Sequence, residues 1–530
     1  MIVIINKIKS GILNGVGGYL IEVEVDISNG LPYFSVVGLA GTQVKESKER
    51  VRSAISNSGY KFPLSRIIVN LSPADMKKDG SYLDLAICMG ILREKINEEE
   101  NFFDETAFLG ELSLDGQIKS MKGIISIAIS FSEINLKNLF IPYENYMECS
   151  ELKNINIIPV KSVRDCINIL KMDKFKRKTY IEERVEDIKK YYRKIEFNEG
   201  KNRIEDEFYE EDFYFIKGNQ VAKRCAEISV AGGHNILMIG PPGTGKTMIA
   251  KAMKNILPSP SKEESLDITR IYSTVGKLYD GSGLIKERPF RSPHHSSTLV
   301  SIVGGGVNAT LGEVTLAHNG ILFLDEFPEF GRRTIDSLRQ PIEDGKVSIS
   351  RLNRSITYPA QFILLATMNA CPCGYFNSSK SCVCRASDID RYRNKISGPI
   401  LDRIDIFCEI SEINFNEFNE DKRVRSREIG KRVEYAKDIQ NIRFKNKCIS
   451  SNSQMSPKDV FIYCKLSGQA EKMAKDIYDK YKLSNRSYVR MLKLSRTIAD
   501  LAGEKNISEK HILEAFSYKR AYYKYFRSKE

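Results

Sequence analysis

Residues 240–247 read Gly-Pro-Pro-Gly-Thr-Gly-Lys-Thr and directly follow the apolar run Asn235-Ile-Leu-Met-Ile. A buried strand followed by this loop and then by a helix is the usual setting of a phosphate-binding loop. The glycines keep Cβ atoms out of the way, so backbone N–H groups can close around phosphates. The sequence therefore predicts a nucleotide site made by Gly240, Pro241, Pro242, Gly243, Thr244, Gly245, Lys246 and Thr247.

Two side chains of this loop have specific expected tasks. Lys246 supplies a cation for the β- and γ-phosphates, and the Thr247 hydroxyl is placed to ligate Mg²⁺. The helix expected to begin near Lys246 adds the positive end of its dipole. ATP and Mg²⁺ are therefore the predicted cofactors.

Two later apolar runs end in polar residues that suit hydrolysis. Gly320-Ile-Leu-Phe-Leu is followed by Asp325 and Glu326, and Gln361-Phe-Ile-Leu-Leu-Ala-Thr-Met is followed by Asn369. We expect Asp325 to hold Mg²⁺ and Glu326 to orient and deprotonate the attacking water. In P-loop ATPases of the AAA+ class, a residue placed like Asn369 contacts this water and the γ-phosphate. Taken alone, the acidic pair and Asn369 would be interpreted as solvated turn residues.

Arg403 lies in the stretch Ser397-Gly-Pro-Ile-Leu-Asp-Arg-Ile-Asp-Ile. One interpretation is a structural ion pair with Asp402 or Asp405. The other is an arginine finger that reaches the γ-phosphate bound by a neighbouring subunit of a ring. We favour the finger, from the order of the motifs and from the family resemblance given below.

Four cysteines follow Asn369 closely. Cys371-Pro-Cys373 and Cys382-Val-Cys384 place four thiols within 14 residues, and four thiolates suit tetrahedral Zn²⁺. The C-x-C spacing is less common in zinc sites than C-x-x-C, so free thiols or an adventitious disulfide are the alternative. We predict a structural zinc that stiffens the loop between Asn369 and Arg403. The other seven cysteines are scattered.

Charge is concentrated at the C-terminal end of the 530-residue chain. The net charge is +13, and residues 421–530 hold 27 lysines and arginines against 13 acidic residues. This segment could contact nucleic-acid phosphates, or it could be a solvated lysine-rich surface, and charge alone favours neither. The longest apolar runs are too short to cross a bilayer, and the N-terminus lacks signal-peptide features. We therefore expect a cytoplasmic protein without a membrane partner.

The pattern of apolar and charged residues divides the chain into four segments. Residues 1–170 alternate strand-like runs, such as residues 20–26 and 65–71, with helical ones, such as residues 43–58. Residues 171–213 are densely charged without a clear apolar stripe, which predicts a partly helical linker. Residues 214–410 alternate strands and helices, as a parallel α/β sheet does. Residues 411–530 read as helices.

Several long motifs together resemble one family. Gly232-Gly-His-Asn, Arg288-Pro-Phe-Arg-Ser-Pro-His-His, Val303-Gly-Gly-Gly, Leu316-Ala-His-Asn-Gly and the stretch around Arg403 are similar to motifs of the YifB/ComM family of magnesium-chelatase-like AAA+ ATPases. The resemblance covers essentially the whole chain. It implies an α/β AAA+ core with a helical C-terminal lid, and a homo-hexamer with ATP at the subunit interfaces.

The same resemblance implies a substrate and one more site residue. It implies DNA, single-stranded or branched, moved by a branch-migration helicase in recombination or natural transformation. Leu483-Ser-Asn-Arg486 resembles the sensor-2 segment, in which Arg486 binds the nucleotide; its alternative is a surface residue of a basic helix. Other open interpretations are a magnesium-chelatase-type or chaperone-like ATPase that remodels a protein partner. His294 and His295, for which no carboxylate partner is visible, are expected to be structural or substrate-loop residues.

The first segment resembles the Lon protease domain, an α+β fold of the S5 domain 2-like type. Lys77-Lys-Asp-Gly-Ser-Tyr-Leu-Asp is similar to the stretch with the Lon nucleophile, but the alignment puts Tyr82 at the serine position and Ile125 at the lysine position. Ser81 lies one residue early, and a shift of one residue would restore it. Because a Ser-Lys dyad needs both groups within hydrogen-bond reach, we expect a non-proteolytic scaffold or DNA-contacting platform.

Overall fold

The structure is a computed structural model that describes residues 5–96, 100–203, 211–278, 283–306, 310–351, 354–412, 423–447 and 449–527. The chain forms two compact units. The first contains Met1–Asn202 and Lys262–Ile285, and the second contains Arg203–Ser261 and Lys286–Glu530. Within the described residues, no helix is long and apolar enough to span a membrane.

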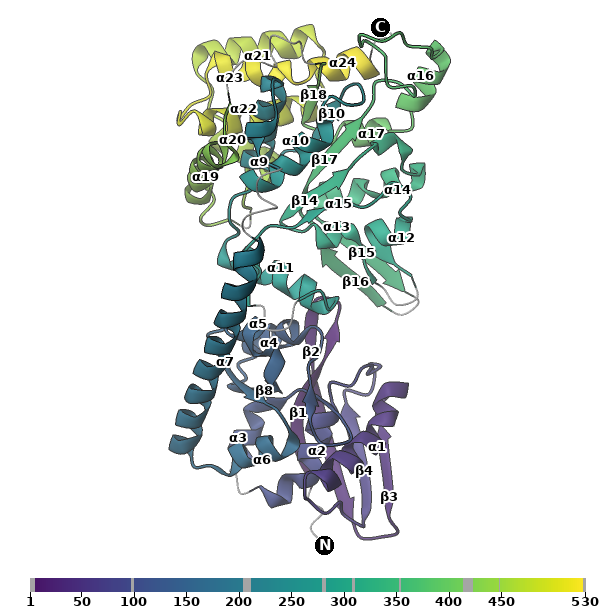
Figure 1. Cartoon of the computed structure of the whole chain (residues 1–530), viewed down its shortest axis with the longest axis vertical. Coiled ribbons are helices and arrows are strands. Elements are labelled where there is room, and N and C mark those ends of the chain that lie inside the picture. Colours follow the sequence, from purple (N-terminus) through teal and green to yellow (C-terminus); the bar gives the residue numbers. More distant parts are fainter. Residues whose placement is uncertain are drawn as a thin grey trace. The chain divides into compact units, whose positions relative to one another are not determined.

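The first unit is built on a seven-stranded sheet in the order β3-β4-β2-β1-β5-β8-β9 (Figure 1). Its strands are β1 (Ile5–Asn14), β2 (Gly17–Ser28), β3 (Tyr33–Val37), β4 (Arg66–Ser72), β5 (Thr106–Phe108), β8 (Asn138–Pro142) and β9 (Asn156–Val160). Alternate residues of β4 are buried, as the period of a strand with one covered face requires. The strands expected around residues 20–26 and 65–71 are thus confirmed as β2 and β4.

Helices cover this sheet. They are α1 (Thr42–Asn57), α2 (Asp84–Leu92), α4 (Ile124–Glu133), α6 (Val163–Lys171) and α7 (Lys174–Arg203), with the short α3 (Glu100–Asp104) and α5 (Tyr146–Cys149). In α7, Ile181, Val185, Ile188 and Tyr192 pack on the cores of the first unit. Their spacing of four, three and four residues is that of one helix face. The expectation that this charged segment lacks an apolar stripe is therefore wrong.

One helix of the first unit comes from an insertion. The helix α11 (Lys262–Thr274) interrupts the sequence of the second unit. The Ser273 hydroxyl donates to Glu148 (2.6 Å) and accepts from the Gly123 amide (3.0 Å), and Arg270 donates to the Val16 carbonyl (3.0 Å). Burial raises the pKa of Glu148 to about 7, although Ser273 and Asn145 donate to it. Lys262–Ile285 thus belongs to the first unit, although it interrupts the segment expected to form the nucleotide-binding module.

The second unit has a five-stranded parallel sheet in the order β11-β14-β17-β10-β18. The strands are β11 (Phe290–Arg291), β14 (Gly320–Leu324), β17 (Phe362–Met368), β10 (Ile236–Ile239) and β18 (Ile406–Glu409). All residues of β10 and β14 are buried, which is typical of a parallel sheet covered on both faces. The predicted parallel α/β core is confirmed.

The two faces of this sheet carry different helices. Ile236 and Met238 face a core shared with α9 (Gln220–Gly232), α10 (Lys246–Ala252) and the C-terminal helices, whereas Leu237 and Ile239 face a second core. That second core includes α12 (Leu299–Val303), α13 (Glu313–Leu316), α14 (Arg332–Ser337), α16 (Ala386–Arg393), α17 (Gly398–Leu401) and α24 (Arg520–Phe526). The helices α19–α23 and α13–α15 accordingly lie on opposite sides of the sheet in Figure 1.

Two short hairpins interrupt the strand–helix alternation. Strands β12 (Gly304–Gly305) and β13 (Thr310–Leu311) pair after α12, and β15 (Lys346–Arg351) pairs with β16 (Arg354–Pro359) after α15 (Arg339–Asp344). Both hairpins are antiparallel. They are additions to the parallel sheet, not members of it.

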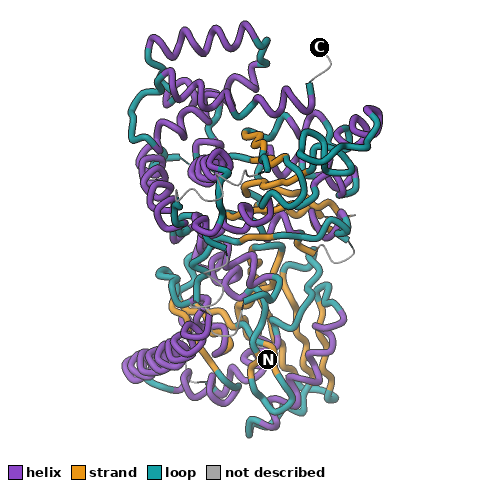
Figure 2. Tube along the Cα trace, turned by 45° about the horizontal axis from the view of Figure 1, so that its top comes forward, coloured by secondary structure: helices purple, strands orange, loops and turns teal. Residues whose placement is uncertain are grey.

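The C-terminal part of the second unit is helical, as predicted (Figure 2). Its helices are α19 (Ser426–Arg443), α20 (Pro457–Tyr463), α21 (Gly468–Lys480), α22 (Asn485–Leu501), α23 (Glu509–Ser517) and α24. Ser456, Ser467 and Ser484 cap α20, α21 and α22 by accepting backbone amides at the helix starts. Side-chain caps of this kind satisfy N–H groups that have no partner within the helix.

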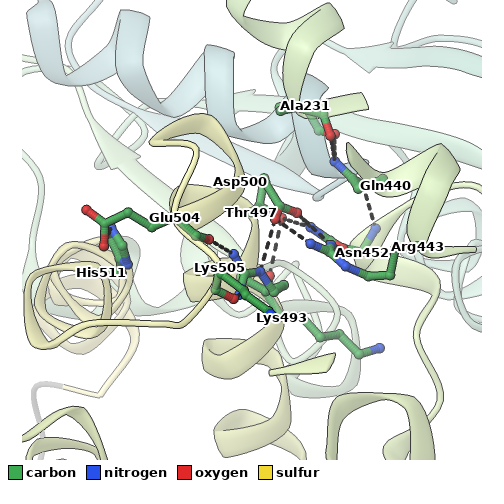
Figure 3. Close-up of polar contacts among 12 residues, drawn as sticks. Ala231, Gln440, Arg443, Asn452, Lys493, Thr497, Asp500, Glu504, Lys505 and His511 are labelled. Carbon is green, nitrogen blue, oxygen red and sulfur yellow. Dashed lines mark hydrogen bonds and ion pairs between the residues drawn. The ribbon is translucent and has the colours of Figure 1, made fainter. Parts of the chain in front are cut away.

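A buried polar network joins these helices to one another (Figure 3). Arg443 donates to both oxygens of Asp500 (2.7 and 2.5 Å), and Arg496 donates to the same carboxylate (3.0 Å). Asn452 donates to Asp500 (2.8 Å) and to the Thr497 hydroxyl (3.1 Å). Because a buried carboxylate is costly without such partners, these bonds stabilise the contact between α19 and α22.

The network reaches the sheet through the Gly-Gly-His-Asn motif. His234 binds the Thr497 hydroxyl through Nε2 (2.8 Å), and a Cβ at Gly232 would lie only 2.4 Å from that hydroxyl. Asn235 then joins two neighbours of β10, because it accepts from the Leu364 amide (2.8 Å) and donates to the Arg403 carbonyl (3.0 Å). The helical lid is therefore anchored at the amino end of β10.

Candidate nucleotide-binding site

The loop after β10 has the backbone that its sequence predicts. Gly243 and Gly245 have φ values of 79° and 86°, which residues with a Cβ rarely adopt. A Cβ at Gly240 would lie 2.4 Å from the Ile410 carbonyl oxygen. The Thr244 hydroxyl donates to the Pro241 carbonyl (2.9 Å), and α10 begins at Lys246. The loop is thus closed on itself at the start of a helix.

Lys246 points into this loop. Its Nζ donates to the carbonyls of Gly240 and Pro241 (2.7 Å each) and to Oδ1 of Asn369 (3.1 Å). Burial lowers the pKa of Lys246 to about 8, against the opposing effect of Asp325 and Glu326. A partly buried ammonium held by neutral carbonyls is suited to an anion, so the residues present fit the phosphates of ATP.

Asp325 is held between two hydroxyls. Thr247 donates to its Oδ2 (3.1 Å), and Thr367 donates to its Oδ1. Thr247 and Asp325 therefore lie close enough to bind one cation together, which fits the expected Mg²⁺. Thr367 was not predicted from the sequence; the available signal was a lone buried hydroxyl near the end of an apolar strand.

Glu326 lies beside Asp325 with unusual backbone geometry. Its φ of 52° and ψ of 48° are left-handed, and its amide donates to the Thr367 hydroxyl (3.2 Å). The Glu326 carboxylate is exposed and lies 3.8 Å from Nδ1 of His295. The structure thus brings Lys246, Thr247, Asp325, Glu326 and Asn369 together at the carboxyl edge of the sheet.

Arg403 and Arg486 lie at the opposite edge. The Arg403 peptide precedes β18, whose Ile406 pairs with Ile236 at the start of β10, whereas the phosphate-binding loop follows the end of β10. Four residues of strand span roughly 13 Å. The structure therefore places neither arginine beside the loop of its own chain.

One carboxylate holds both arginines. Arg403 and Arg486 each donate to Glu343, the latter at 2.6 Å, and Arg403 also donates to the Pro399 carbonyl (2.5 Å). Arg403 is only 6% exposed, and its pKa is lowered by burial and by nearby arginines. Asp405, considered above as a partner of Arg403, instead lies 3.2 Å from Arg490 and 3.5 Å from His234.

The four cysteines form one cluster. Their Sγ atoms lie within 4.8 Å of one another, with separations of 3.4 Å (Cys371–Cys373), 3.6 Å (Cys373–Cys382) and 3.7 Å (Cys371–Cys382). Four thiolates at Zn–S bonds of about 2.3 Å in a tetrahedron are about 3.8 Å apart. These thiols, including Cys384, thus fit a tetrahedral metal, and all are free of disulfides.

The cysteine loop packs against the phosphate-binding loop. Gly374 has a φ of 88°, and a Cβ there would lie 2.8 Å from the ring of Pro242. Asn369, which accepts from Lys246, directly precedes Ala370 and Cys371. The cluster is therefore connected to the nucleotide site through packing and through the chain itself.

In the first unit, the residues aligned with the Lon dyad make other contacts. The Ser81 hydroxyl donates to Glu111, and the Tyr82 hydroxyl donates to the Lys122 carbonyl (3.0 Å). Burial raises the pKa of Tyr82 to about 12. Ile125 is fully buried in α4. The contacts of these hydroxyls in the described structure are thus with a carboxylate and a carbonyl, not with a lysine amine.

Comparisons with known proteins cover most of the chain. The family models described as magnesium chelatase, subunit ChlI, as subunit ChlI of Mg-chelatase, and as magnesium chelatase, subunit ChlI C-terminal match residues 212–418, 23–145 and 423–519. An uncharacterized protein YifB of Salmonella typhimurium is 38% identical, and the competence protein ComM of Haemophilus influenzae is 37% identical, each over 95% of both chains.

A partial similarity agrees with the Lon-like character predicted for the N-terminal segment. A Lon protease of Buchnera aphidicola is 27% identical over 29% of this chain and 21% of its own length. The long matches to YifB and ComM, together with the parallel sheet, the phosphate-binding loop and the helical C-terminal part, confirm the resemblance drawn from the motifs. The chain belongs to the YifB/ComM family of magnesium-chelatase-like AAA+ ATPases.

Proposed function

We propose that this protein is an ATP-hydrolysing motor that assembles as a homo-hexamer and acts on DNA. The observation that carries the proposal is the division of charged groups between the two edges of the parallel sheet. Lys246, Asp325 and Glu326 surround the phosphate-binding loop at one edge, and Arg403 and Arg486 share Glu343 at the other. A site divided in this way is complete only when two copies meet.

Hydrolysis follows from the groups at the carboxyl edge. The loop amides and Lys246 bind the β- and γ-phosphates of ATP, and Thr247 and Asp325 hold Mg²⁺, which offsets phosphate charge. Asn369 orients the attacking water. Glu326 accepts its proton, the task of a general base at this position.

The groups at the amino edge serve a neighbouring copy. Burial and the nearby Arg339, Arg486 and Arg490 lower the pKa of Arg403, so a cluster of guanidiniums surrounds Arg403. Such a cluster suits the terminal phosphate bound by another subunit, where an arginine can raise the rate by about 10³–10⁵. In a closed ring each subunit gives one edge and receives the other, which supports the hexamer.

DNA is the proposed substrate, in recombination or natural transformation. A relative of nearly equal length is named a competence protein, and residues 421–530, with 27 basic and 13 acidic residues, account for the net positive charge of the chain. The hairpin β15–β16 adds basic residues, because its last backbone pair is Arg351 with Arg354. We propose branch migration or helicase movement as the work that ATP drives.

Zn²⁺ at Cys371, Cys373, Cys382 and Cys384 is the proposed structural metal. The measured Sγ separations fit a tetrahedral site, and four protein ligands leave no open position for catalysis. Its proposed task is to hold the loop that follows Asn369 against Pro242.

The substrate is tested by measuring ATPase rate against added ligands. We expect single-stranded DNA or a four-way junction to raise the rate, and the increase to weaken steeply as salt rises, because phosphate contacts release counterions. A porphyrin and an unfolded protein are the matched comparisons. Stimulation by either of these but not by DNA would favour a chelatase-type or chaperone-like motor.

Glu326→Gln tests the general base. The variant should bind ATP as tightly as the native protein, while kcat falls by about 10²–10⁴-fold because no carboxylate accepts the proton. Glu329→Gln, an exposed acid on the next turn, is the control and should retain the native rate. Near-native turnover by Glu326→Gln would remove this residue as the base.

Mixed rings test the arginine in trans. Arg403→Ala and Lys246→Ala should each lose ATPase activity when alone in the ring. For Arg403→Ala the rate of hydrolysis should fall by about 10³-fold or more. Mixing the two should restore ATPase, because a ring then contains interfaces with an intact loop from one subunit and an intact arginine from the next. The Arg403→Ala protein must still bind nucleotide. Mixed rings that form without regaining activity would contradict the assignment.

Metal analysis tests the cysteine cluster. Protein purified under reducing conditions should contain about one zinc per chain, and Cys384→Ser should lose it. Cys166→Ala, a buried thiol of the first unit, should retain the metal. Native protein without zinc would leave the cluster as thiols only.

A further inference from the structure

The carboxylate of Glu326, the proposed general base, lies close to His295, a residue without an assigned role so far. Nδ1 of His295 lies 3.8 Å from Oε2 of Glu326, and the two side chains are 40% and 57% exposed. The ring of His294 lies against His295, with centroids 4.1 Å apart. His295 is thus the carboxylate's neighbour although it lies 31 residues earlier in the chain.

The carboxylate of Glu326 depends on few contacts. Within the described ranges of the chain, His295 is the side chain that the structure shows within ion-pair distance of it. The hydrogen bonds that Glu326 makes to Asp325 and Thr367 come from its backbone amide and leave the carboxylate unheld. A long acidic side chain with one partner is free to rotate once that partner is lost, whereas a general base must point at its proton.

The chain segment that carries His295, by contrast, is held on both sides of this residue. Before it, Arg291 forms two hydrogen bonds with Glu313 (2.6 and 2.9 Å) and Arg288 donates to the carbonyls of Pro258 (2.7 Å) and Asn319 (2.8 Å). These contacts hold β11, which pairs with β14, and Asp325 directly follows β14.

After His295, the chain turns back at once. The Ser297 amide donates to the His294 carbonyl (2.9 Å), and Nδ1 of His294 lies 2.8 Å from the Ser296 hydroxyl. Thr298 then caps α12 by accepting the Ser301 amide (3.2 Å). The ring therefore approaches Glu326 from a turn whose position the surrounding backbone sets.

We propose that His295 is a positioning residue for Glu326: its ring N–H donates to the carboxylate and holds it toward the attacking water. The 3.8 Å separation closes to a hydrogen bond by a small rotation of either exposed side chain, and such contacts commonly tighten when substrate binds. The inference rests on the proposed ATPase function and deepens the role of that site.

Kinetics of the full chain test the role. His295→Ala should lower kcat by about tenfold to 100-fold, the cost of a misplaced catalytic group, while KM and the directly measured affinity for ATP stay native. His295→Gln, which still offers an N–H donor, should recover most of the rate. Glu287→Ala changes an exposed side chain shortly before β11, and should retain the native rate and melting temperature.

A double variant separates positioning from a general loss of structure. In a Glu326→Gln background, adding His295→Ala should cause no further loss, because the base is already gone. The proposal would be overturned if the losses of the two variants added, or if His295→Ala alone hydrolysed ATP at the native rate or faster. Either result would leave the proposed ATPase function intact, provided that the native protein hydrolyses ATP. A native chain that does not hydrolyse ATP would overturn both.

Discussion

The parallel pairing of β10 with β17 and β18 is the constraint on which the rest of the second unit depends. Because all strands run the same way, their carboxyl ends lie at one edge of the sheet and their amino ends at the other. The residues that follow β10, β14 and β17 meet at the carboxyl edge, where the phosphate-binding loop lies. Arg403 precedes β18 and is therefore at the amino edge. The separation of the phosphate-binding loop from Arg403 is a property of strand direction, before any side chain is considered.

The sequence predicted the parts of the site that belong to continuous motifs. The loop at 240–247 and the polar residues after β14 and β17 could be identified because strand, turn and chemistry are adjacent in the chain. Their roles remain proposals, but their convergence follows from parallel pairing. The same reasoning succeeded for β2, β4 and α1, whose apolar periods are strong.

What the sequence did not predict depends on contacts between distant segments. Glu343 binds Arg403 and Arg486 from 60 and 143 residues away, and no local pattern selects it over other acids. His295 meets Glu326 because β11 lies beside β14, and a two-residue strand leaves no readable period. In α7, the apolar residues Ile181, Val185, Ile188 and Tyr192 mark the buried face among many charged residues. The mean hydropathy of the whole segment is dominated by the charged residues and does not reveal them.

The insertion of α11 has a consequence for dissecting the protein. The backbone passes between the two units after residues 202, 261 and 285, so a single cut cannot release either one. A fragment that begins at residue 203 would still carry α11, whose Ile268 and Ile271 are buried in the intact chain. Without the first unit, this helix would present apolar side chains to water and invite aggregation. An isolated ATPase fragment therefore requires a short loop in place of residues 262–285 as well as the loss of the N-terminal segment.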